Sequence, residues 1–107
     1  MRTLAVVGLL LAACPKTTPI KELLDDPGRF DGKTVRIAGE VTSSIGALGY
    51  GAYRVDDGTG TLSVIVRSGG STPRVGAKVG VEGEFRSAFT LGTQTVAVLM
   101  EEQRRSP

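Results

Sequence analysis

The sequence contains no histidine, no tryptophan and a single cysteine, Cys14. Histidine is the commonest general base near neutral pH and the commonest metal ligand in proteins. Zinc sites and nucleophilic triads usually draw on histidine or a free cysteine, so both are excluded in their usual forms. The groups left for chemistry are carboxylates, lysines, tyrosines and hydroxyls. We therefore expect a protein that is not an enzyme, with no cofactor and no metal site.

An excess of charge of one sign is also lacking. The 107 residues hold 13 Lys and Arg against 11 Asp and Glu, a formal net charge of +2. No basic run precedes the final Arg104-Arg105 pair. Proteins that bind nucleic acid tightly neutralise many phosphates with clustered basic side chains. This composition therefore disfavours a nucleic-acid function.

The N-terminal residues combine a positive start, a short apolar run and small residues before the cysteine. Arg2 precedes Leu4 to Ala13, which is almost wholly apolar but shorter than the ~20 residues that span a bilayer. This order is typical of a signal peptide, here residues 1–13. The run Leu11-Ala12-Ala13-Cys14 resembles the lipobox of bacterial lipoproteins, which are cut just before the cysteine.

That resemblance implies that Cys14 is the lipidation site and that acyl chains anchor the mature protein to a membrane. Pro15 follows the cysteine where inner-membrane lipoproteins of some enteric bacteria carry aspartate, which implies the outer membrane, facing the periplasm. Two other interpretations stay open. The protein is secreted after cleavage behind Ala13 without a lipid, or it is cytoplasmic and Cys14 is an ordinary buried thiol.

The rest of the chain has the length of one small domain. We expect a lipidated cysteine and tether over residues 14–19, a folded domain over 20–100 and a charged, frayed tail over 101–107. Helical spacing of apolar residues predicts one short amphipathic helix over Ile20 to Asp26. Thr18 is the expected cap of this helix, and Pro27-Gly28 is expected to end it.

Alternation of apolar and polar residues predicts five strands after the helix. The Asp57 to Gly60 turn between the second and third is a strong hairpin signal, whereas Ser43 to Gly49 is expected to be a loop. Gly39 and Gly83 interrupt the apolar faces of the first and fourth strands, where glycine often marks a bulge or bend. The expected strands are Thr34–Thr42, Tyr50–Asp56, Thr61–Arg67, Lys78–Phe89 and Gln94–Met100.

Three motifs resemble the OB-fold domains of small bacterial envelope proteins. They are IKELLDDPGRFDGKTVRIAGEV (20–41), YRVDDGTG (53–60) and VGAKVGVEG (75–83). The resemblance implies an all-β fold, a small five-stranded Greek-key barrel with one short N-terminal helix. The link over Ser68 to Ala77 is too short and glycine-rich for the helix usual there, so the N-terminal helix is expected to close the barrel instead.

OB-folds bind oligonucleotides or oligosaccharides across their second and third strands and the adjoining loops. On this chain that face would include Tyr50, Arg54, Arg67 and Phe89. By alternation, Tyr53 and Phe85 belong to the core. Tyr50 and Phe89 are then the only candidates for base stacking. Two aromatic side chains are few for a surface that binds single-stranded nucleic acid.

We therefore expect a lipid-anchored module that recognises an envelope protein or glycan through this face and the loops Ser43 to Gly49 and Thr90 to Thr93. Single-stranded nucleic-acid binding is the alternative. The acidic turn from Asp56 to Gly60 lacks the spaced ligands and distal glutamate of a calcium loop. Glu82 and Glu84 are interpreted as solubility charges, because nothing indicates the cleft of a glycosidase.

Overall fold

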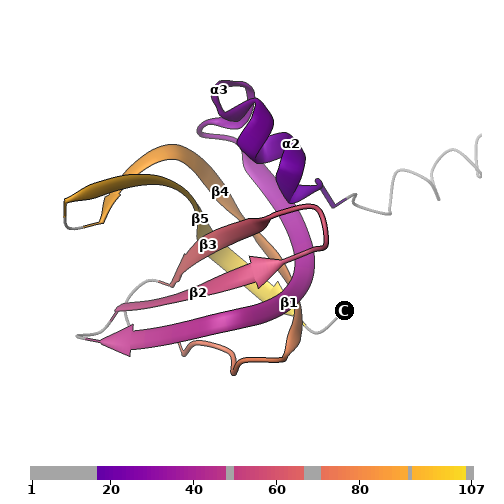
Figure 1. Ribbon diagram of the computed structural model, residues 1–107, viewed down its shortest axis with the longest axis vertical. Coiled ribbons are helices and arrows are strands. Elements are labelled where there is room, and N and C mark those ends of the chain that lie inside the picture. The colour runs from indigo at the N-terminus through magenta and orange to yellow at the C-terminus, as the bar shows by residue number, and fades with distance from the viewer. Residues whose placement is uncertain (1–16, 48–49, 67–70, 92, 106–107) are drawn as a thin grey trace, which may run out of the picture.

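A computed structural model of the chain describes residues 17–47, 50–66, 71–91 and 93–105. Cys14 and Arg67 lie outside the described residues, and so does the side chain of Tyr50. The described elements are two short helices followed by five strands (Figure 1). They are α2 Ile20–Asp25, α3 Pro27–Phe30, β1 Thr34–Ala47, β2 Tyr50–Asp56, β3 Thr61–Val66, β4 Lys78–Leu91 and β5 Gln94–Arg105.

The five strands close into a barrel in the order β1-β2-β3-β5-β4. All neighbouring pairs are antiparallel except β3 with β5, which run parallel. The expected five-stranded closed barrel is thus confirmed. β1 and β4 are long strands that coil around the barrel (Figure 1). The pairing of β1 with β2 has a register shift between Val41 and Ser43, and the pairing of β4 with β5 has shifts after Glu82 and after Arg86.

The barrel interior holds the main hydrophobic core. Tyr53, Val64, Leu99 and Phe85 form one row across β2, β3, β5 and β4, and each is 1% exposed or less. Tyr53 and Phe85 are therefore core residues, as their positions in the alternation predicted. Ile20 and Leu23 of α2 are fully buried in the same core, so the N-terminal helix covers one end of the barrel.

The helical segment differs from its prediction in two ways. It is divided at Asp26, and Pro27 begins a second helix, α3, instead of ending the first. Thr18 is not its cap, because the residue before α2 is Pro19 and makes no side-chain hydrogen bond. The β2–β3 turn satisfies the first helical N–H groups instead: Ile20 donates to Asp57 Oδ2 at 2.9 Å and Lys21 to Thr59 Oγ1 at 3.1 Å.

Strand boundaries were predicted well where a turn marks them and poorly elsewhere. β2 has its predicted bounds, and the turn after it is a tight hairpin. The expected loop from Ser43 is instead strand as far as Ala47, because it pairs with Tyr50 to Arg54 of β2. The expected tail from Glu101 is strand as far as Arg105, because it pairs with Gly80 to Gly83 of β4.

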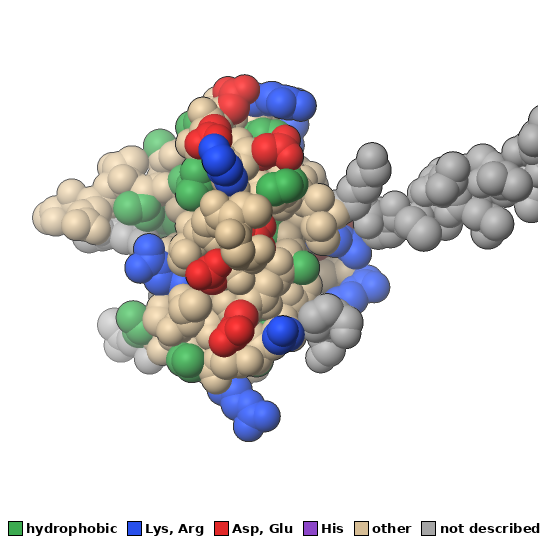
Figure 2. All heavy atoms as spheres, turned by 45° about the vertical axis from the view of Figure 1, so that its right-hand side comes forward, with side chains coloured by type: hydrophobic (Ala, Val, Ile, Leu, Met, Phe, Trp, Pro, Cys, Tyr) green, Lys and Arg blue, Asp and Glu red, His purple; other side chains and the backbone are tan. Residues whose placement is uncertain are grey.

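β4 also continues two residues beyond its predicted end, to Leu91, and β3 is described only to Val66. No helix lies between β3 and β4 in residues 71–77, in agreement with the expectation for this link. None of the helices within the described ranges is long and apolar enough to cross a membrane. Charges of both signs are mixed on the face in Figure 2, without a continuous basic band.

Candidate binding face

The outer surface of the barrel over β2, β3 and β5 is the candidate binding face. Residues opposite one another in paired strands project to the same side of a sheet. Two rows of side chains therefore cross the outside of the barrel. The first row is Ile45, Ala52, Ile65, Met100 and Glu84, and the second is Ser43, Arg54, Ser63, Val98 and Arg86.

The first row is apolar over four successive strands. Ile65, Val98 and Met100 form a second hydrophobic cluster, separate from the barrel core, and are at most 8% exposed. The end of the β4–β5 hairpin contributes Phe89 and Val96, which pack against this cluster. β5 is thus apolar on both faces, and β3 is apolar on its outer face at Ile65. Ile65, which breaks the alternation of its strand, was the sequence signal for this outer cluster.

The residues predicted for the site have different positions. Arg54 is exposed in the second row, as expected of a face residue. Phe89 is partly buried, and it packs against the outer cluster. Tyr50 is the first residue of β2 and pairs with Ala47. The structure does not describe its side chain or Arg67, so their proposed contacts stay predictions.

The surroundings of this face carry little charge. Neither Val41 to Tyr53, around the β1–β2 connection, nor Ser87 to Met100, around the β4–β5 connection, contains a charged residue. Figure 1 shows both hairpins extending toward the same side of the barrel. Arg86 lies 3.3 Å from a carboxylate oxygen of Glu84, which partly neutralises it. The face is therefore apolar and neutral, with Arg54 as its exposed cation among the described residues.

A polar cluster closes the barrel beside this face. The hydroxyl of Tyr53 donates to Glu101, and Arg104 lies over the Tyr53 ring at 5.6 Å while donating to the Ser71 carbonyl at 2.9 Å. Burial raises the pKa of Tyr53, and the adjacent Glu101 carboxylate raises it further. The phenol therefore stays protonated and serves as a hydrogen-bond donor. Sequence reasoning missed this cluster because it assigned Glu101 and Arg104 to a tail.

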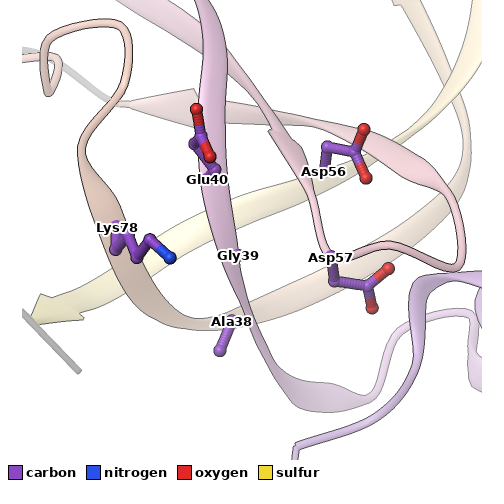
Figure 3. Close-up of a pocket in the computed structure, with 6 residues that line it drawn as sticks. All are labelled: Ala38, Gly39, Glu40, Asp56, Asp57 and Lys78. Atoms are coloured by element: carbon purple, nitrogen blue, oxygen red, sulfur yellow. The ribbon is translucent and has the colours of Figure 1, made fainter.

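A depression of about 350 Å³ lies where β1 passes from β4 to β2 (Figure 3). Its lining residues are Ala38, Gly39, Glu40, Asp56, Asp57 and Lys78. The three carboxylates point in different directions (Figure 3), and no group of three or more metal-ligating side chains occurs in the described parts of the chain. Asp57 is committed to the turn, where its Oδ1 accepts from the Thr59 backbone at 2.8 Å.

Comparison with known proteins identifies the fold. No protein-family model matches the chain, and no curated protein matches it in sequence. An aspartyl-tRNA synthetase from Entamoeba histolytica is similar over 84% of this chain and 21% of its own, with TM-score 0.68 and 18% identity. The OBody AM3L09 bound to hen egg-white lysozyme is similar over 85% of this chain and 94% of its own, with TM-score 0.64 and 17% identity.

A replication protein A heterotrimer bound to ssDNA is similar over 71% of this chain, with TM-score 0.57 and 22% identity. The chain spans 57% of that protein's chain and about a fifth of the synthetase. The strand order of the barrel agrees with the similarity to these solved structures.

The chain has an OB-fold.

The ligand surface common to OB-folds is the outer side of strands two and three with the 1–2 and 4–5 loops. In this OB-fold the two rows lie on that surface, and the Ala47–Tyr50 and Leu91–Gln94 connections correspond to those loops. The acidic depression lies at the opposite end of β2, beside the β2–β3 turn.

Proposed function

We propose that this chain is a non-catalytic binding module whose ligand contacts the outer face of β2, β3 and β5. The observation that carries the proposal is the apolar row Ile45, Ala52, Ile65 and Met100, which lies outside the barrel on the surface where OB-folds bind. Ile65 and Met100 are at most 8% exposed, and Phe89 and Val96 of the β4–β5 hairpin pack against their cluster. A ligand would therefore reach this row through Ile45 and Ala52.

The proposed ligand is a protein or a glycan of the bacterial envelope. The two uncharged hairpins and the apolar row suit a partner of low charge. Protein recognition is within reach of this barrel shape, since the similar OBody is bound to lysozyme. The resemblance of Leu11 to Cys14 to a lipobox supports lipidation of Cys14 and attachment to the outer membrane, facing the periplasm, as part of this proposal.

Single-stranded nucleic acid is the second candidate, and the structural comparisons favour it. The similar replication protein A is bound to ssDNA, and another similar protein is an aspartyl-tRNA synthetase. The charge distribution favours the first candidate, because phosphate backbones are bound by several cations. On the described face, Arg54 and the Glu84-paired Arg86 are the cations present.

A photo-crosslinking experiment distinguishes these candidates. A benzophenone amino acid replaces Ser63, which lies at the centre of the second row, in the full-length protein in its own cells. The matched control carries the same group at Thr34, an exposed residue at the far end of β1. We expect an adduct at position 63 that contains a second protein by mass spectrometry or is shortened by glycan hydrolases, and none at position 34.

A nuclease-sensitive adduct at position 63 would instead establish the second candidate. Equal labelling at positions 63 and 34, or no adduct at either position, would contradict the proposed binding face.

A further inference from the structure

Ile45 is the most exposed of the large hydrophobic side chains in the described parts of the chain. It is 67% exposed, compared with 60% for Val75 and 43% for Leu24. It lies near the end of β1, where it forms the outermost position of the apolar row on the barrel surface. An isolated exposed isoleucine needs no explanation. Ile45 does need one, because it lies on the edge of a strand.

One edge of β1 has no backbone partner at this end among residues 17–47, 50–66, 71–91 and 93–105. One edge pairs with β2 as far as Ala47. The other edge pairs with β4 only as far as Glu40, and the Val41 backbone then bonds to Gly76 and Ala77 at 2.8 and 2.9 Å. From Ser43 to Ala47, no described residue makes a backbone hydrogen bond to that edge.

This edge has few of the features that prevent exposed strand edges from pairing with other chains. Natural sheet edges are usually protected by lysine, proline or inward-pointing charges. The stretch from Val41 to Tyr53 contains no proline and no charged residue. The register shift after Val41 is the one protective irregularity, and it precedes the unpaired segment.

We propose that this edge pairs with the same edge of a second copy of the chain, antiparallel and centred on Ile45. A two-fold axis at this position places the two Ile45 side chains directly opposite one another and buries both. Because the segment carries no charge, the pairing opposes no like charges. Two copies of this edge present the same uncharged side chains, so the pairing needs no second protein with complementary side chains. This favours a second copy of the chain over another protein as the occupant.

The dimer is weak and reversible. Five residues a side bury much less than the ~1,200 Å² typical of stable interfaces. Attachment to a membrane would concentrate the chains and favour pairing. Ile45 also belongs to the apolar row of the proposed ligand face, but the pairing itself uses backbone groups on the edge of β1 and is tested without any ligand.

Cysteine trapping in the full-length protein tests the register. Residues directly opposite in an antiparallel pair have Cα atoms ~4.5–5.5 Å apart, within disulfide reach. Ile45→Cys should therefore give disulfide-linked dimers with diamide, at least fivefold more than Ser43→Cys. Two copies of residue 43 would lie about 13 Å apart along the paired strands, beyond disulfide reach.

Thr34→Cys, exposed at the other end of β1, is the control for random collision, and the unmodified chain reports crosslinking through Cys14. Both should stay at background. Equal dimer yields at positions 34, 43 and 45 would overturn the proposal. So would crosslinking of Ile45→Cys to a different protein, which would show strand addition by another chain.

Discussion

Gly39 lies where β1 crosses closely over the end of β2. A Cβ atom at this position would be 2.4 Å from the carbonyl oxygen of Asp56 and 2.9 Å from a methyl of Val55. Gly83 has the same constraint on β4, where a Cβ would be 2.1 Å from the Met100 carbonyl oxygen. The two strands coil at these glycines because only the absence of a side chain permits the approach.

Gly39→Val should lower the free energy of unfolding by about 2–3 kcal/mol, because the backbone of Asp56 must move to admit the side chain. Thermal melts of the domain from Lys16 onward measure the effect. Gly80→Val is the matched control, since a Cβ there meets only the Arg105 carbonyl oxygen at 3.9 Å. An unchanged midpoint for the Gly39 variant would contradict the coiled first strand.

Asp57 links the β2–β3 turn to α2. Desolvation raises the pKa of this carboxyl group, but hydrogen bonds from Thr59, Ile20 and Gly60 outweigh it and leave the pKa below its ordinary 3.8. A lowered folded-state pKa stabilises the fold above the unfolded value, and this stabilisation is lost as the pH falls through the folded value.

Asp57→Ala should therefore cost about 1 kcal/mol at pH 7, as for the loss of a helix cap. The difference from the parent protein should shrink as the pH falls below the ordinary 3.8 toward the lowered pKa. Urea unfolding at pH 7 and pH 2.5 measures both values. Asp26→Ala is the control, because Asp26 makes no side-chain capping bond. A pH-independent difference would show that Asp57 acts without its charge.

At the scale of elements, the C-terminal half of β5 completes the barrel. Glu101 accepts the Tyr53 hydroxyl bond, and Arg104 ties the strand to Ser71 in the link between β3 and β4. The segment also pairs with Gly80 to Gly83 of β4. These charged residues therefore contribute to folding, although their composition suggested a solvated tail.

Ending the chain after Met100 should lower the melting temperature by about 10 °C. The buried Tyr53 hydroxyl then loses its charged partner, a bond type worth about 1.5–3 kcal/mol, and each kcal/mol shifts a small domain by about 4–8 °C. A chain ending after Arg105 is the control and should melt like the parent protein. Equal melting of the two truncated chains would show that residues 101–105 are dispensable.

The sequence predicts elements where one short segment contains the whole signal. The β2–β3 hairpin was predicted because alternation flanks an Asp-Gly turn, and α2 because its apolar spacing is helical. Ser43 to Ala47 and Glu101 to Arg105 were missed because they are strands only through their partners on β2 and β4. Arg54 was predicted on the face, but the outer cluster of Ile65, Val98 and Met100 depends on strand order.

At the scale of the whole molecule, the barrel follows an N-terminal segment that resembles a lipoprotein signal, for which lipidation is our proposal. The described domain begins at Thr17, three residues after Cys14, so a lipid there would hold the α2 end of the barrel close to the membrane. Three residues span at most about 11 Å. Both uncharged hairpins extend from one side of the barrel, away from α2 (Figure 1).

Cys14→Ser should abolish incorporation of a fatty-acid analogue and reduce the membrane-bound fraction of the protein. Metabolic labelling followed by membrane fractionation measures both effects. Ser43→Ala, which leaves the lipobox intact, should label like the parent protein. Equal labelling of the parent protein and the Cys14 variant would contradict lipidation at this residue.

Fluorescence anisotropy with a labelled single-stranded 20-mer, as DNA and as RNA, tests most directly whether this OB-fold face serves a ligand of low charge. We expect dissociation constants no tighter than ~10⁻⁶–10⁻⁴ M at physiological salt, the range of non-specific association. Each stacked base would add only ~1–3 kcal/mol, and Phe89 is packed against the outer cluster. Submicromolar binding that weakens on Arg54→Ala or Phe89→Ala would contradict the account and establish a nucleic-acid-binding face.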